Sequence, residues 1–121
     1  HDGWNEGQID EPERIASSDA ILIVDGVFLL RPELNGFWDV RVFVDIEAEQ
    51  SLERGVERDL TLEEPTVGAL RRRQRLRVYR ERYLPAEETY LNEVDPIALV
   101  DIVVDNRDLN APRLIVQRTP A

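Results

Sequence analysis

The chain of 121 residues contains no cysteine, no lysine and only one histidine, His1. Without cysteine there can be no disulfide, no thiolate nucleophile and no cysteine-ligated zinc site. A single histidine excludes histidine-rich metal sites and most histidine-dependent catalytic triads. Any chemistry in this chain must therefore rest on carboxylates, arginines and backbone groups.

Long apolar runs are also absent. No stretch approaches the roughly 20 consecutive apolar residues that a membrane-spanning helix needs, and the first residues lack the basic and apolar regions of a signal peptide. Hydrophobic residues make up 42% of the chain, which is sufficient for the core of one domain or of a piece of one. We therefore expect a cytoplasmic protein without a membrane partner.

Acidic charge dominates the composition. The formal net charge is −10, and all 15 basic residues are arginine. Residues 71 to 82, RRRQRLRVYRER, hold seven arginines and one glutamate, a local charge of +6 that leaves −16 on the rest of the chain. A nucleic-acid-binding domain usually has a basic face and a high isoelectric point, so this distribution disfavours nucleic acid as a partner. The segment is either a local anion clamp or a solvated helix face paired with nearby glutamates.

Three apolar runs have the length of strands, at residues 20 to 25, 40 to 46 and 100 to 106. The first is an unbroken aliphatic run too short for a helix, which is typical of a parallel-sheet strand buried on both faces. Residues 1 to 20 are polar and turn-rich, so before this run we expect a loop, either alone or with a short helix. After the third run, the chain closes with a short apolar stretch and a fraying tail.

Helical patterns occupy the interval between the second and third strands. Apolar residues spaced four apart, at 48, 52, 56 and 60, predict an amphipathic helix. A longer helix is expected from about residue 66 to residue 84, restarting at Pro85 and continuing to about Val94. Strands separated by helices predict an α/β fold with a mainly parallel sheet and flanking helices.

Polar side chains end or follow all three predicted strands. Because ligands bind at the carboxyl ends of strands in such sheets, we expect Asp25, Asp45 and Asn106 at one edge. A carboxylate that directly follows a buried strand and precedes a glycine is typical of the Mg²⁺ site of P-loop nucleotide enzymes. Alternatively, Asp25 is a strand-end residue that caps a turn.

Two arginines stand one turn apart in SLERGVERD, residues 51 to 59. Arg54 and Arg58 each lie two residues from the apolar stripe, roughly 200° around the helix, so both face away from the core. Paired arginines at this spacing can bind a phosphate chain and stabilise the negative charge of a transferring phosphoryl group. Alternatively, they are ordinary surface arginines beside Glu53 and Glu57.

Four segments follow one another in a fixed order: ILIVDGVFLLRPELNGFWDVRVFVDI, SLERGVERD, RYLPAEETYLNEVDP and DIVVDN. In this order they resemble the C-terminal half or more of uridine kinase-like P-loop nucleoside kinases, from about Ile21 to Pro112. The resemblance implies a partial P-loop NTPase fold, with residues 1–121 as the C-terminal part of one kinase domain. Its expected parts are a loop-rich lead-in (1–20), a Walker B-like strand with a second strand and a helix (21–60), an arginine-rich lid (61–95), and the last strand and tail (100–121).

The resemblance also implies an activity and its phosphate-binding residues. Such a kinase transfers the γ-phosphoryl group of ATP to a nucleoside 5′-hydroxyl, with uridine or cytidine as the expected acceptor. Asp25 matches the Walker B-like acid and would help to position Mg²⁺. Arg54 and Arg58 match the lid arginines that close over ATP, and residues 71 to 82 would continue the lid.

Four further residues receive roles only through the resemblance. Asn106 and Pro112, in the loop after the last strand, would border the adenine. His1 and Asp2 resemble an HD pair that precedes the Walker B strand, and they would lie near the acceptor nucleoside.

The chain departs from the family at two points. Asp25 stands where the family more usually has glutamate, and the chain contains no G-x-x-x-x-G-K-[ST] loop to hold the phosphates. We therefore expect these residues to be part of a longer kinase and to be inactive alone. The alternatives are another small-molecule P-loop kinase, or a non-catalytic module that binds an acidic partner through its arginine helix or forms a homodimer through a sheet edge.

Overall fold

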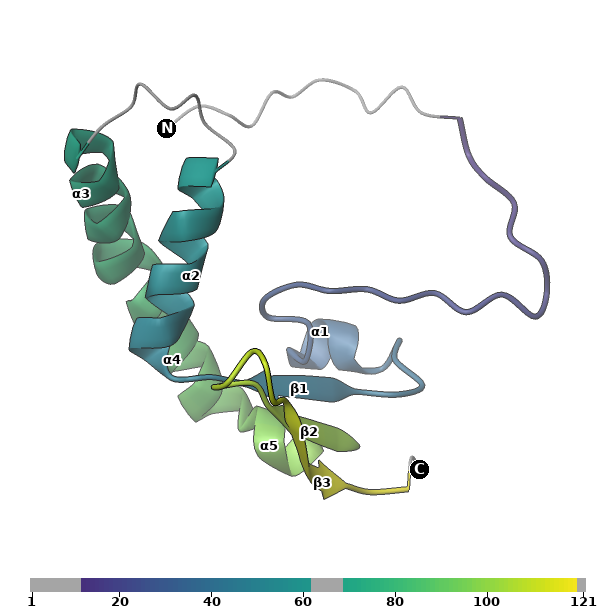
Figure 1. The fold of residues 1–121 in the computed structure, drawn as a ribbon. Coiled ribbons are helices and arrows are strands. Elements are labelled where there is room, and N and C mark those ends of the chain that lie inside the picture. The colour runs from purple at the N-terminus through teal and green to yellow at the C-terminus, as the bar shows by residue number, and fades with distance from the viewer. Residues whose placement is uncertain (1–11, 62–68, 120–121) are drawn as a thin grey trace.

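The computed structural model describes residues 12–61 and 69–119. Nine elements follow one another in these ranges (Figure 1). They are α1 (Pro32–Asn35), β1 (Val42–Asp45), α2 (Ala48–Thr61), α3 (Ala69–Val78), the π-helix η1 (Tyr79–Tyr83), α4 (Leu84–Val94), α5 (Pro96–Leu99), β2 (Ile102–Asp105) and β3 (Arg113–Gln117). None of the helices in the described ranges has the length and apolar character needed to cross a membrane.

The three strands form one sheet in the order β1-β2-β3. β1 and β2 are parallel, with Val42 opposite Ile102 and Asp45 opposite Asp105, whereas β2 and β3 are antiparallel. The predicted α/β class is confirmed, but the prediction of a mainly parallel sheet is wrong. A short loop joins β2 directly to β3, and such a connection can only return the chain antiparallel.

Residues 20 to 25 form no strand, so the predicted Walker B-like strand is wrong for this structure. Ile21, Leu22 and Ile23 are 89%, 84% and 86% exposed. Figure 1 shows the chain before α1 as a trace without a strand arrow. A strand requires a neighbour for its backbone N–H and C=O groups, and no described strand lies beside this one.

The other predicted elements are found close to their expected positions. β1 and β2 fall within the two remaining apolar runs, and α2 covers the amphipathic pattern. The long predicted helix is observed over its described part as α3 and η1, while its first residues lie outside the described ranges. Pro85 stands in the first turn of α4, and the helix runs into α4 from η1 without a break at Tyr83 or Leu84. That helix ends at Asp95, whose φ of 48° is left-handed.

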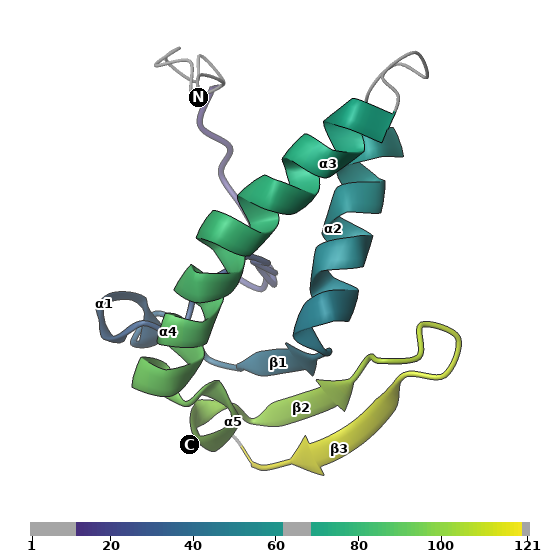
Figure 2. The same ribbon diagram turned by 90° about the vertical axis from the view of Figure 1, so that its left-hand side faces the viewer.

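The helices form a hairpin of α2 against a continuous rod of α3, η1 and α4 (Figure 2). Leu52, Gly55 and Val56 are the buried residues of α2. A Cβ atom on Gly55 would lie 2.7 Å from the nearest ring atom of Tyr79, so the close approach of η1 to α2 requires glycine here.

A small core lies between the sheet and the α1 and α4 regions. Leu30, Val100 and Val103 are buried together, with Trp38 and Tyr90 among the partly buried side chains packed on them. The Trp38 indole donates to the Leu29 carbonyl at 2.6 Å, and the Tyr90 hydroxyl accepts from the Leu30 backbone N–H at 3.2 Å. The Tyr90 bond ties the turn before α1 to α4, and the Trp38 bond ties the same turn to the segment between α1 and β1.

Candidate functional site at the carboxyl edge of the sheet

The parallel strands β1 and β2 end side by side at Asp45 and Asp105. The chain leaves β1 into α2 and leaves β2 into the loop of residues 106–112, which we name the β2–β3 loop. The Asn106 backbone N–H donates to the Asp45 carbonyl at 2.9 Å, so the loop begins at this edge. The structure therefore brings Asp45 and Asn106 together as predicted.

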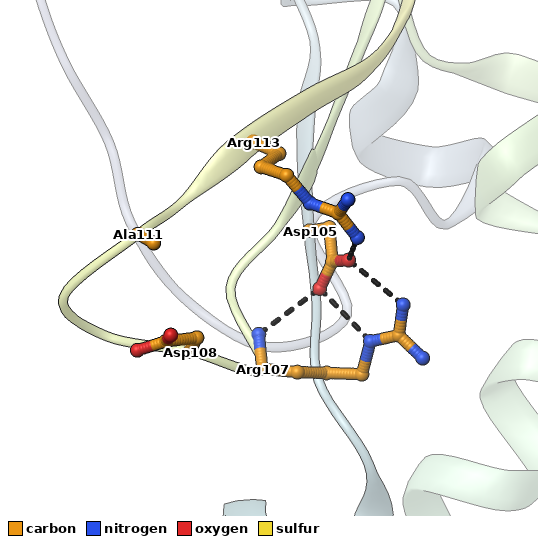
Figure 3. Close-up of a pocket in the computed structure, with 5 residues that line it drawn as sticks. All are labelled: Asp105, Arg107, Asp108, Ala111 and Arg113. Atoms are coloured by element: carbon orange, nitrogen blue, oxygen red, sulfur yellow. Dashed lines mark hydrogen bonds and ion pairs between the residues drawn. The ribbon is translucent and has the colours of Figure 1, made fainter.

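Asp105 is the best-bonded side chain of this edge and is only 5% exposed. Arg107 donates to its Oδ1 from the backbone nitrogen at 3.1 Å and from Nε at 2.9 Å, and to its Oδ2 from Nη2 at 2.8 Å. Arg113 at the start of β3 adds a 3.0 Å bond to Oδ2 (Figure 3). The bonds from Arg107, and next that from Arg113, hold the pKa of the Asp105 carboxyl well below its ordinary value.

An open cavity of about 520 Å³ lies in the bend of the loop. Figure 3 shows its lining, which comprises Asp105, Arg107, Asp108, Ala111 and Arg113. Because the Asp105 oxygens accept from two guanidinium groups, they are occupied by protein donors.

Arg54 reaches from α2 to the same loop. Its Nη1 donates to the Asn106 carbonyl at 2.9 Å and its Nη2 donates to the Arg107 carbonyl at 2.8 Å. Gln50, one turn earlier on α2, donates to the Arg107 carbonyl at 3.2 Å. Arg54 is thus in direct contact with the backbone of Asn106, and the resemblance implies a site role for both residues.

Arg58 has different neighbours. Its side chain is 71% exposed, and its Nε lies 3.8 Å from Asp59 Oδ1. Asp59 also accepts a 3.4 Å hydrogen bond from the Tyr79 hydroxyl. Burial, and then the charge of Asp59, raises the pKa of Tyr79. Arg54 and Arg58 therefore do not converge in this structure, but the guanidinium of Arg58 remains accessible.

The remaining predicted site residues are scattered. Asp25 lies in the exposed segment before α1 and does not end a strand, so its predicted place at the carboxyl end of a strand is wrong for this structure. Pro112 is exposed in the β2–β3 loop, directly before β3. His1 and Asp2 lie outside the described residues. In the part of the chain that the structure describes, no group of three or more histidine, cysteine, aspartate or glutamate side chains could hold a metal ion.

Arginines of the segment 71–82 pair with acids of α2. Exposed pairs of this kind contribute about 0–1 kcal/mol each. Within the helical rod, Arg77 Nε lies 2.9 Å from Glu81 Oε1. Between the helices, the pairs are Arg72 with Glu57, Arg75 with Asp59 at 3.9 Å, and Arg80 with Glu49 at 3.8 Å. These contacts favour the paired helix face over an open anion clamp for these four arginines.

Sequence reasoning missed three residues of the site: Gln50, Arg107 and Arg113. The signal for the last two is the stretch DNRDLNAPR, in which an acid ends a strand and arginines follow two and eight positions later around a turn. Only a hairpin brings the second arginine back to the acid, and the antiparallel pairing of β3 was not expected. Comparisons with protein-family models, with curated proteins and with solved structures give no match for this chain.

Proposed function

We propose that this chain is part of an ATP-dependent nucleoside kinase resembling uridine kinase, which transfers the γ-phosphoryl group of ATP to a nucleoside 5′-hydroxyl. The contact between Arg54 and the Asn106 carbonyl is the observation that supports it most. The resemblance alone assigns these two residues, 52 positions apart in the chain, to the ATP end of one site. They meet at the carboxyl ends of parallel strands, where α/β sheets bind ligands.

In this proposal Arg58 interacts with the transferring phosphoryl group. A guanidinium near that group stabilises the negative charge that develops during transfer. The exposure of the Arg58 side chain leaves its donors accessible to a ligand that approaches from solvent.

The proposed reaction also requires binding sites for Mg²⁺ and for the ATP phosphates. Mg²⁺ is usually bound by one or two carboxylates together with substrate phosphates and water. The oxygens of Asp25 suit this role because no described residue pairs with them, whereas those of Asp105 accept from Arg107 and Arg113. The proposal therefore assigns Mg²⁺ to Asp25 rather than to Asp105. It also requires a P-loop from outside these 121 residues.

The test is an assay of the polypeptide that carries these residues, with ATP, Mg²⁺ and either uridine or cytidine. We expect formation of ADP and the nucleoside monophosphate. Arg58→Ala should lower kcat by about 100-fold with a smaller change in KM, because the lost interaction is made in the transition state. Arg31→Ala, which removes an exposed arginine paired with Glu33 at the start of α1, is the control and should keep normal kinetics.

Failure to phosphorylate either nucleoside would contradict the proposed activity. Consumption of ATP with another small hydroxyl compound would instead indicate a different P-loop kinase. An unchanged kcat in Arg58→Ala would mean that Arg58 is only a solvated surface residue.

A second candidate, a non-catalytic interaction module, is supported by the exposed aliphatic run at residues 21–23 and by the outer edge of β1. In the described ranges β1 pairs only with β2, and its Val42 and Val44 are half exposed. Exposed apolar runs and unpaired strand edges are surfaces through which chains associate. A stable dimer by light scattering that ATP does not stabilise against heat would favour this candidate; a monomer that ATP stabilises would contradict it.

A further inference from the structure

Arg54 holds the β2–β3 loop by a fork of two hydrogen bonds. The two terminal nitrogens of one guanidinium donate to the carbonyls of consecutive residues, Asn106 and Arg107, at 2.9 and 2.8 Å. The planar guanidinium presents its donors in a fixed geometry, which suits two acceptors at a set separation. Gln50 donates to the second of these carbonyls from the same helix.

The same stretch of loop is held from its other side by the sheet. The Arg107 side chain and backbone nitrogen bond Asp105, which is buried at the end of β2. The Asn106 N–H bonds the carbonyl at the end of β1. The first two residues of the loop are therefore fixed between α2 and both parallel strands, and Arg54 supplies the larger part of the connection to α2.

We propose that Arg54 is a positioning residue that fixes the β2–β3 loop against α2, and that it does not contact the transferring phosphoryl group. One N–H of each terminal nitrogen donates to a neutral carbonyl, and these two bonds orient the guanidinium toward the loop. A phosphate that took these two N–H groups would have to displace the loop carbonyls. Arg58, one turn farther along α2, keeps an exposed guanidinium. The effect on kinetic parameters rests on the proposed function. In that function Arg54 positions the loop that would border the adenine, and Arg58 stabilises the negative charge that develops on the phosphoryl group.

The first experiment measures amide hydrogen exchange in the peptide that covers residues 106–112, in the polypeptide that carries this chain and without ATP. Arg54→Ala should speed exchange in this peptide by about tenfold, because hydrogen bonds from a charged donor are lost. Gln50→Ala should give a smaller increase in the same peptide. Arg58→Ala is the matched control on the same helix and should leave this peptide unchanged.

Arg54→Lys separates geometry from charge. Lysine retains the positive charge but lacks the planar fork, so we expect it not to restore protection of the loop. Unchanged exchange in Arg54→Ala, or full restoration of protection by lysine, would overturn the positioning role.

The second experiment compares kinetic parameters in the same variants. Arg54→Ala should raise KM for ATP by about tenfold with less effect on kcat, the reverse of Arg58→Ala. Equal losses of kcat in both variants, together with unchanged loop exchange, would place Arg54 at the phosphoryl group and overturn the inference. An absence of phosphorylation by every variant would contradict the proposed function alone, because the exchange measurement uses no ATP.

Discussion

Residues 21–25 and 42–45 are both short apolar runs that end in an aspartate, and only the second is a strand. The side chains of the first run extend into solvent, with Ile21 at 89% exposure. The second run pairs along its full length with β2, from Val42 opposite Ile102 to Asp45 opposite Asp105. The difference shows that strand propensity alone does not order such a run, since its backbone groups must also find a neighbouring strand.

Hydrogen bonds to distant residues at the start of β1 explain why this run forms a strand. The Arg41 backbone N–H donates to the buried carboxylate of Asp101 at 2.7 Å, and the Arg41 carbonyl accepts from the Asp101 N–H at 3.0 Å. The Arg41 side chain then bonds Asn35 at the end of α1. The described structure places no equivalent anchor before residue 21, so the first run remains extended and unpaired.

The largest expected effect comes from the same truncation made in both regions. Leu52→Ala removes a side chain that is 1% exposed and should cost about 2–5 kcal/mol of unfolding free energy, because it leaves a cavity beneath α2. Leu22→Ala removes one that is 84% exposed and should change it by less than about 0.5 kcal/mol. Urea unfolding followed by circular dichroism measures both. A comparable loss in Leu22→Ala would mean that the first run is packed in solution.

A glycine substitution tests how closely α2 packs on η1 in the helical hairpin. Gly55→Ala places a methyl group 2.7 Å from the Tyr79 ring, which must shift, and should destabilise the chain by about 1–3 kcal/mol. Gly36→Ala is the control, since no atom lies within 4 Å of the added carbon and φ is −70°. It should be neutral or slightly stabilising.

The thermal midpoint measures both glycine variants. A neutral Gly55→Ala would show that α2 and η1 can separate without loss. In that case Tyr79→Leu, which shortens the side chain facing Gly55, should also leave the midpoint unchanged.

Local patterns were enough to predict most of the elements. The period of α2, the apolar runs of β1 and β2 and the helix that extends past Pro85 to Val94 depend on nearby residues, and all are observed. The failure at residues 20–25 and the antiparallel β3 concern pairing between distant segments. Sequence patterns record what a strand is made of, but they do not identify the partner that it pairs with.

For the candidate site, too, some residues could be predicted from local patterns and others depended on distant contacts. Arg54 and Asn106 were both recognised as site residues, yet their contact joins a guanidinium to a backbone carbonyl, which no side-chain pattern reveals. Arg107 was missed because its role depends on the burial of Asp105. Asp25 was placed at the sheet edge on the assumption that its run was a strand.

The smallest expected effect concerns the two aspartates and depends on pH. Arg107 and Arg113 lower the pKa of Asp105 in the folded chain, so this carboxylate binds a proton less readily there than in the unfolded chain. Its contribution to stability is therefore fully present above the ordinary carboxyl pKa of about 3.9 and is lost as the pH falls below that value toward the lowered pKa. Asp105→Asn should lower the thermal midpoint at pH 7 and remove part of its decline below about pH 4.

Asp25→Asn is the matched control because Asp25 is exposed and no described residue pairs with it. Its thermal midpoint should follow that of the unmodified chain across the whole pH range. If Asp25→Asn instead flattened the acid decline as Asp105→Asn does, the carboxylate of Asp25 would have a cationic partner in solution. Residues 21–25 would then pack on the rest of the chain in solution, and the difference between residues 21–25 and 42–45 would not apply there.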